Sequence, residues 1–177
     1  VRTPMDFTRE ELSFHVIDDK GRKVDAAVEL VSEMERKWNS DGEYGNKAGI
    51  IFTATVNGSK GCHSLAGRIS TLLNMDVRYF SGSAPKMGVL QGEAFDRYKR
   101  QVQDDFKENK YRLLTATKAF GMGVNKGNIA YTVHFGIPGS MEALYQEAGR
   151  AGRDKKLFKE VPADCYVLLT KEPNSAI

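Results

Sequence analysis

The chain has 177 residues, enough for one good-sized domain but too few for two full lobes. Its net charge is only +3, so any surface that binds nucleic acid must be local. Cys62 and Cys165 lie far apart and outside any metal-ligand spacing, which excludes a zinc site and favours an intracellular protein with free thiols. No apolar run is long enough to span a membrane, and no signal or transit peptide pattern opens the chain. Because the first residue is Val, we expect a piece of a longer protein.

Strand and helix patterns alternate along the chain. Residues 1–12 are polar and contain a proline, so we expect a linker there and one domain over residues 13–177. Short apolar runs predict strands at residues 13–17, 48–53, 77–80, 111–115, 130–135 and 164–169. Helical spacing predicts helices near 24–38 and 65–73, a charged helix ending near Lys107, and a helix after Ser140. This order predicts an α/β fold with a parallel sheet of about six strands sandwiched by helices, and ligands beyond the carboxyl ends of the strands.

The helix after Ser140 is the most informative element. Serine is a favoured N-cap residue, and it follows a Pro-Gly pair that separates this helix from the preceding strand. Apolar side chains then recur at i, i+3, i+4 and i+7, which predicts a buried stripe. The stripe consists of Met141, Leu144, Tyr145 and Ala148.

A neighbouring face of the same helix carries potential phosphate ligands. Residues 145–154 read Tyr-Gln-Glu-Ala-Gly-Arg-Ala-Gly-Arg-Asp, so Gln146, Arg150 and Arg153 follow an i, i+4, i+7 spacing. Gly149 and Gly152 would each destabilise a helix by roughly 1 kcal/mol relative to alanine, which predicts a backbone held close to a partner, with a polyanion as the natural candidate. A guanidinium group binds two phosphate oxygens in bidentate fashion, and it stays charged at any working pH. The alternative is a surface helix with two solvated arginines.

The loop after the fourth predicted strand offers polar groups at a strand's carboxyl end. It reads Thr-Ala-Thr-Lys-Ala-Phe-Gly-Met-Gly-Val-Asn-Lys over residues 115–126. Thr115, Thr117 and Lys118 could contact a phosphodiester chain, and Asn125 could contact a sugar hydroxyl. An ordinary long crossover is the alternative.

The loop after the second predicted strand suggests backbone contacts to an extended polyanion. Residues 53–61 read Thr-Ala-Thr-Val-Asn-Gly-Ser-Lys-Gly, which lacks the spacing of a P-loop, as does the rest of the chain. We expect Thr53, Thr55, Asn57, Ser59 and the following helix N-terminus to contact a phosphate backbone. The alternative is a simple helix cap.

Other candidates are weaker. His15, His63 and His134 are isolated, and His134 is best explained as a satisfied histidine at the edge of the core. Solvation explains the two carboxylate pairs, Asp18-Asp19 and Asp104-Asp105. The chain thus has groups that bind phosphate but none that would hold Mg2+ or activate water, as in half of a catalytic site.

The two motifs together resemble a known family. Thr-Ala-Thr-x-Ala-Phe-Gly-Met-Gly-Val-Asn-Lys, followed by Tyr-Gln-Glu-Ala-Gly-Arg-Ala-Gly-Arg-Asp, closely resembles motifs V and VI of RecQ-type superfamily 2 DNA helicases. Residues 7–16 and 49–52 are similar to that family's entry into its second RecA-like lobe. The segment 82–102 is longer than the family's usual passage, and Lys126-Gly127 replaces Lys-Pro. The role of the insertion near residues 83–95 stays open.

The resemblance implies a role for each motif. The family is a motor of two RecA-like lobes that closes on ATP and unwinds DNA in the 3' to 5' direction; the first lobe supplies the phosphate loop and holds Mg2+. Residues 1–12 would then be the inter-lobe linker and residues 13–177 the second lobe, a P-loop NTPase-like lobe without its own P-loop. It implies that Arg153 is the arginine finger, with Arg150 and Gln146 beside it, and that Asn125 and Gly123 also approach ATP. Along the DNA would lie Thr53, Thr55, Asn57, Ser59, Thr115, Thr117 and Lys118.

Three further expectations follow from the resemblance, and alternatives stay open. The isolated fragment should be inactive, because the first lobe of the same polypeptide is missing. The partner would be single-stranded or forked DNA rather than a membrane, and the location the bacterial nucleoid or a eukaryotic nucleus. A stand-alone docking module without ATPase activity is the main alternative, and RNA is a milder alternative as the track. A dinucleotide-binding enzyme is disfavoured, because no GxGxxG opens a helix.

Overall fold

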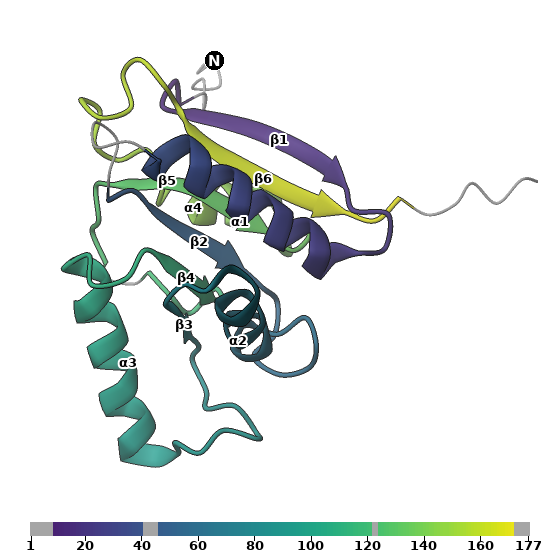
Figure 1. Cartoon of the computed structure of the whole chain (residues 1–177), viewed down its shortest axis with the longest axis vertical. Coiled ribbons are helices and arrows are strands. Elements are labelled where there is room, and N and C mark those ends of the chain that lie inside the picture. Colours follow the sequence, from purple (N-terminus) through teal and green to yellow (C-terminus); the bar gives the residue numbers. More distant parts are fainter. Residues whose placement is uncertain (1–8, 41–45, 122–123, 172–177) are drawn as a thin grey trace, which may run out of the picture.

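A single parallel sheet organises the chain. The computed structural model describes residues 9–40, 46–121 and 124–171, and within them six strands pair in the order β1-β6-β5-β2-β4-β3 (Figure 1). Every pairing is parallel, as predicted. The strands are β1 (Leu12–Asp18), β2 (Ala48–Phe52), β3 (Val77–Phe80), β4 (Leu113–Ala116), β5 (Ile129–His134) and β6 (Ala163–Leu169). The helices of the described residues are α1 (Lys23–Asn39), α2 (Cys62–Leu73), α3 (Gly92–Lys107) and α4 (Met141–Ala148).

Burial follows position in the sheet. The central strands β2, β4 and β5 are buried at every residue, because helices cover both faces of a parallel sheet. The edge strand β1 alternates instead, with Phe14 and Val16 exposed. In β1, exposed and partly buried residues alternate, so this strand is covered on one face only.

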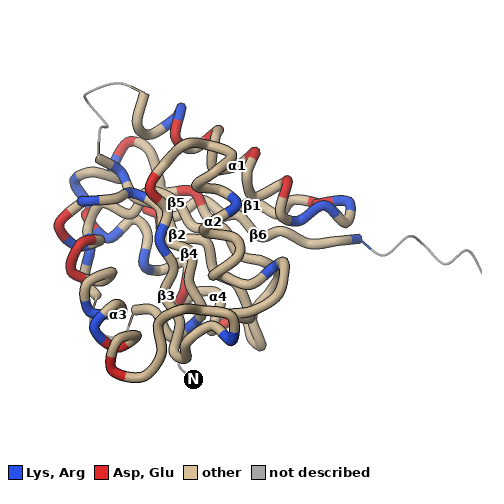
Figure 2. Tube along the Cα trace, turned by 60° about the horizontal axis from the view of Figure 1, so that its bottom comes forward, with Lys and Arg blue, Asp and Glu red and all other residues tan. Residues whose placement is uncertain are grey.

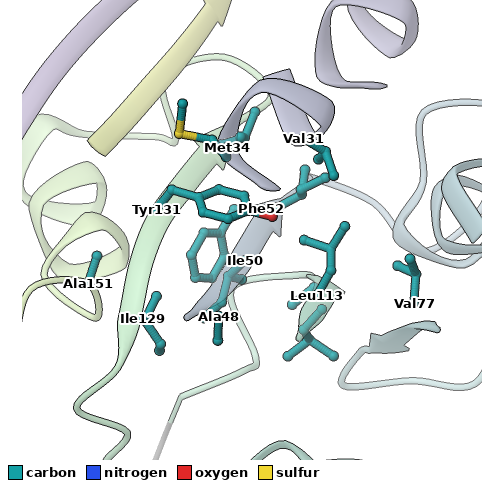
Figure 3. Packing of buried hydrophobic residues seen from close by; sticks show 14 of the residues in the cluster. Val31, Met34, Ala48, Ile50, Phe52, Val77, Leu113, Ile129, Tyr131 and Ala151 are labelled. Carbon is teal, nitrogen blue, oxygen red and sulfur yellow. The ribbon is translucent and has the colours of Figure 1, made fainter. Parts of the chain in front are cut away.

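Helices cover both faces of the sheet. The α1 and α2 helices pack against each other on one face, and α4 lies behind β5 and β6 on the other (Figure 1). The α3 helix lies beside the edge strand β3. The buried stripe of α1 reaches the sheet through Val31 and Met34, which lie near Ile50 and Tyr131 in the core (Figure 3). Apolar contacts of this kind supply most of the stability of such a layered fold.

Asp164 ties α1 to the sheet. Its carboxylate, almost fully buried at the start of β6, accepts hydrogen bonds from Lys37 Nζ at 2.6 Å and Trp38 Nε1 at 3.2 Å. His15 Nε2, on the neighbouring strand β1, lies 3.1 Å from the other carboxylate oxygen. A buried carboxylate is tolerated because these partners replace its hydration.

Two expectations about exposure were wrong. Asp19 and Asp105 are buried rather than solvated: Asp19 accepts from Gly21 N and Thr170 Oγ1, and Asp105 pairs with Arg78 and Lys110. Pairing with Lys110 and Arg78 lowers the pKa of Asp105 to about 2. Sequence spacing cannot show that a distant cation will meet a carboxylate.

The predicted stripe of the last helix was only half right. Leu144 and Ala148 are buried, whereas Met141 and Tyr145 are exposed, and Tyr145 packs edge-on against Phe14 of β1. The predicted N-cap is confirmed, because Ser140 Oγ accepts from the backbone N–H of Ala143 at 3.1 Å. A short helix over an edge strand leaves part of its apolar face in solvent.

Candidate functional site

Three neighbouring strands bring their end loops together at the carboxyl edge of the sheet. Because β2, β4 and β3 are consecutive in the strand order, the loops that follow them are adjacent. A cleft of about 220 Å³ opens at this edge between the ends of β2 and β5. It is lined by Phe52, Thr53, Ala54, Lys118, His134, Phe135, Gly136, Ile137, Pro138, Gly139 and Glu147. The cleft therefore brings together two residues predicted to contact nucleic acid, Thr53 and Lys118.

A buried polar chain forms part of the cleft wall. His134 Nδ1 lies 3.0 Å from Glu147 Oε2 on α4, and its Nε2 lies 2.9 Å from Thr132 Oγ1. The ring also stacks on Phe52 of β2. Both ring nitrogens thus have partners, which confirms the expectation that His134 is a satisfied histidine.

The loop after β2 uses most of its polar groups internally. Thr53 Oγ1 donates to Thr55 O at 2.8 Å, and Thr55 Oγ1 donates to Asn57 O at 3.1 Å. The first backbone amides of α2 also donate into this loop, Cys62 N to Thr55 O and His63 N to Val56 O. The helix N-terminus is thus capped by its own loop, the alternative considered from the sequence.

Thr115, Thr117 and Lys118 have different surroundings. The hydroxyl of Thr115 is fully buried in β4 and donates to Cys62 O at 2.7 Å. A direct contact between this side chain and a nucleic acid is excluded by its burial, which corrects the prediction. Thr117 is nearly buried at the end of the strand, and Lys118 is exposed. Lys118 is therefore the cation of this loop that can reach a phosphate.

Asn57 and Ser59 lie at the outer rim of the same edge. Both residues are exposed. The Oδ1 atom of Asn57 already accepts a hydrogen bond from the backbone N–H of Lys86, at 2.9 Å. Its amide nitrogen is the remaining donor for a ligand.

The arginine motif lies elsewhere, near the amino end of β5. The α4 helix ends at Ala148, so Arg150 and Arg153 follow it in an irregular turn instead of continuing the helical face that the spacing predicted. Gly152 has a φ of +63° and donates its N–H to Ile129 O, at the first residue of β5. These arginines therefore lie away from the carboxyl ends of the strands, where ligands are expected from the fold class.

The two glycines of the motif face the protein's own N-terminal segment. Arg9 donates to Gly149 O at 3.0 Å and to Gly152 O at 2.9 Å. A methyl group on Gly152 would lie 2.6 Å from Glu11 O, so this close approach requires glycine. The partner of this backbone is thus Arg9 and Glu11 rather than the polyanion suggested by the sequence.

Arg150 is held by a glycine from the loop between β4 and β5. Its Nη1 donates to Gly121 O at 2.8 Å, and its Nε is buried without a hydrogen-bond partner among the described residues. Gly121 has a φ of +118°, and a Cβ atom there would lie 1.8 Å from the guanidinium carbon of Arg150. Burial, together with the nearby charge of Arg153, lowers the pKa of Arg150.

Arg153 is the exposed member of the pair. Its Nη1 lies 3.3 Å from both Val124 O and Asn125 Oδ1, and Nε lies 3.3 Å from Gly149 O. These are long hydrogen bonds, which a stronger anionic acceptor could replace. The structure therefore brings Arg150, Arg153 and Asn125 together, whereas Gln146 is an exposed residue of α4 and Gly123 lies outside the described residues.

Sequence reasoning missed two of the residues that build this cluster. Arg9 lies in a segment that reads as a polar linker, and Gly121 lies in a loop whose glycines suggested a ligand contact. The available signal was the Gly-x-Gly pair in that loop, but it does not indicate which side chain approaches.

The described residues contain neither a cluster of metal ligands nor a helix that could span a membrane. No group of three or more His, Cys, Asp or Glu side chains in this part of the chain is arranged to hold a metal ion. None of its helices is long and apolar enough to cross a bilayer.

Comparison with known proteins gives consistent matches. A family model described as the helicase conserved C-terminal domain matches residues 23–155. The ATP-dependent DNA helicase RecQ of Bacillus subtilis is 34% identical over 166 residues, which is 94% of this chain and 23% of that protein. RecQ of Haemophilus influenzae is 50% identical over 78 residues, covering 41% of this chain and 12% of that protein. The chain therefore spans a quarter or less of the length of these relatives.

Solved structures share the fold. Domain 2 of the DEAD-box helicase Mss116p, bound to an RNA duplex, has a TM-score of 0.67 and 21% identity over 91% of this chain and 55% of that chain. The helicase MrfA bound to DNA and AMPPNP has a TM-score of 0.63 and 18% identity over 90% of this chain and 20% of that chain. At these identities the likeness concerns the RecA-like fold alone.

Proposed function

This chain belongs to the family of helicase conserved C-terminal domains, and from that premise we propose that it is the second motor lobe of an ATP-dependent 3'-to-5' DNA helicase of the RecQ type. The relatives it resembles over most of its length are ATP-dependent DNA helicases. The lobe contributes two separate functional surfaces, one for the nucleotide and one for the nucleic-acid strand.

The nucleotide surface is the cluster of Arg150, Arg153 and Asn125. Arg153 acts as the arginine finger on the γ-phosphate, and this role is supported by its exposure and by its long, replaceable hydrogen bonds. Arg150 is the positioning residue beside it, because its guanidinium is bonded to Gly121 O and can couple closure to the loop between β4 and β5. Asn125 reaches the ribose from the same loop.

The strand surface is the carboxyl edge of the sheet. Exposed Lys118 supplies a cation, and Thr53, Thr55, Asn57, Ser59 and Thr117 supply polar groups and backbone to a phosphodiester chain. The two surfaces flank opposite ends of strands in one rigid sheet. Movement of one surface on nucleotide binding must therefore move the other, which is what a motor lobe requires.

The missing half of the reaction belongs to the first lobe. That lobe holds Mg2+ and the phosphate loop, so this chain by itself hydrolyses essentially no ATP. The part of this chain is to supply positive charge to the transferring phosphoryl group from across the interface between the two lobes.

The exposure of Arg153 is the single observation that supports its role at the nucleotide. Substitution of this residue tests the role. In the full-length protein, Arg153→Ala should lower DNA-stimulated ATP hydrolysis about a thousandfold or more, as loss of an arginine finger does in related NTPases. Binding of single-stranded DNA should remain within about threefold, because the strand surface is separate.

Lys155→Ala is the matched control, since it removes another exposed cation two residues further along the chain, which lies 3.6 Å from Glu11. Its hydrolysis rate should stay within about twofold of the wild type. An Arg153→Ala protein that still turns over ATP like the control would refute the finger assignment. A full-length protein without DNA-stimulated hydrolysis would refute the motor function itself.

A further inference from the structure

The segment between β3 and α3 is an ordered loop held by internal hydrogen bonds. Ser81 Oγ donates to Ser83 O at 2.7 Å, and Gly88 N donates to Pro85 O at 3.0 Å. Gln91 Nε2 closes the segment by donating to the same Pro85 carbonyl at 2.9 Å. Figure 1 shows this part of the chain running out beyond α2 before it turns back into α3. We call residues 81–91 the rim loop.

The rim loop contacts both neighbouring loops of the strand surface, the loop after β2 and the loop after β4. The backbone N–H of Lys86 donates to Asn57 Oδ1, at 2.9 Å, in the loop after β2. At its other end, a methyl group on Gly82 would lie 3.3 Å from Ala119 Cβ, next to Lys118 in the loop after β4. The rim loop thus continues the proposed strand surface outward from the cleft.

The outer part of the rim loop is apolar and fully open to solvent. Met87 is 92% exposed and Val89 98% exposed, which makes them the most exposed of the large hydrophobic side chains in the described residues. Leu90 adds a third, less exposed apolar side chain. Neighbouring apolar side chains held in water by an ordered turn indicate a contact surface.

The charge of the rim loop indicates which class of partner it binds. Residues 81–92 include one lysine, Lys86, and no carboxylate. Elsewhere the surface mixes both signs, as Figure 2 shows for α1 and α3. An apolar tip beside a cation, without an acidic group, fits a nucleobase next to its own phosphate. Methionine is well suited to the flat face of a base, because its side chain is flexible and polarizable.

We infer that Met87 and Val89 of the rim loop contact nucleobases where the duplex opens and act as an apolar wedge between base steps. The inference rests on the proposed motor function, because the strand must lie along the carboxyl edge. Apolar side chains that insert at a base step partly unstack it and so offset part of the cost of opening that step. The wedge would lower the barrier to opening the next base pair as the lobe advances.

The test separates unwinding from ATP hydrolysis in the full-length protein. Met87→Ser/Val89→Ser should slow the unwinding of a forked duplex about tenfold, while ATP hydrolysis stimulated by oligo-dT stays within about twofold of the wild type. Leu72→Ser is the matched control, since it replaces an exposed apolar residue of α2 away from the rim loop. It should leave both rates unchanged.

A binding readout addresses the contact directly. A fork with 2-aminopurine at the junction should brighten when the wild type binds it without ATP, and should brighten less with the double variant. Met87→Gln/Val89→Thr, which keeps the side-chain size and removes the apolar character, should behave as the serine variant does. If the wild type unwinds the fork and both double variants match it in rate and fluorescence, the wedge is refuted. If the wild type itself neither unwinds nor hydrolyses ATP, the motor proposal fails instead.

Discussion

Lys126 should make the stability of this chain rise with pH through the alkaline range. It lies in the loop between β4 and β5 with only 4% of its surface exposed, next to Asn125. Its Nζ donates to Asn109 Oδ1 and lies 5.0 Å from the centre of the Phe106 ring. Burial, with an amide rather than a carboxylate as partner, lowers its pKa from 10.5 to about 8.

The direction and size of this pH effect on stability depend on how many protons the folded and unfolded chains bind. The unfolded chain keeps this proton up to about pH 10.5, whereas the folded chain loses it near pH 8, so the unfolded state binds more protons between those values. The free energy of unfolding therefore increases with pH in that window and is flat below it. At about 1.4 kcal/mol per pH unit, the gap corresponds to at most about 3 kcal/mol.

Lys126→Met removes the buried charge and keeps an apolar stem of similar length. At pH 7 the variant should be more stable than the wild type by roughly 2 kcal/mol, because about 1 kcal/mol is lost with the hydrogen bond to Asn109. Asn109 Oδ1 keeps a donor, Asn128 Nδ2, at 2.8 Å. Most of the advantage should disappear by pH 10.

Urea unfolding at a series of pH values, followed by circular dichroism, measures this difference. The buried tyrosines, whose pKa values burial raises, affect both proteins equally and cancel in the comparison. Parallel stability curves for the two proteins from pH 7 to pH 10 would refute the reasoning. So would a variant less stable than the wild type at pH 7.

Two further predictions concern groups that position the site. Gly121→Ala should displace Arg150, since the new methyl group would overlap its guanidinium; in the full-length protein the ATP hydrolysis rate should fall to that of Arg150→Ala, and the double variant should be no worse than either single one. Additive losses in that cycle would show that the two residues act separately. Asp164→Ala should lower the free energy of unfolding by about 3 kcal/mol, because three donors lose their acceptor and one of them, Trp38 Nε1, is buried. A change below about 0.5 kcal/mol in urea unfolding would contradict that account.

The sequence by itself determined the elements and their order. The six strands lie within about two residues of the predicted bounds, because hydrophobic runs and helical spacing are local properties of the chain. Ser140 was identified as an N-cap from its residue type and position, and the cap is formed as predicted. The alternation of strands and helices then predicted the parallel sheet, because parallel neighbours need crossover connections.

Tertiary structure decided which polar groups remain available. Thr115 and Asp105 looked accessible in the sequence, but one is buried under α2 and the other is paired with Arg78. The end of α4 at Ala148 likewise separated Arg150 from the face of Gln146. For Thr115 and Asp105 the deciding partners are Cys62 and Arg78, which belong to other elements of the fold, and local spacing does not identify them.

The arginine cluster and the proposed strand surface lie at different ends of the strands. Both belong to motifs recognisable in the sequence, and the RecA-like fold was predicted from them. Their distance depends on where the chain crosses the sheet: Thr117 and Lys118 follow the carboxyl end of β4, whereas the turn with Arg153 returns to the amino end of β5. Sequence spacing measures distance along the chain, and only the packed sheet converts it into distance in space.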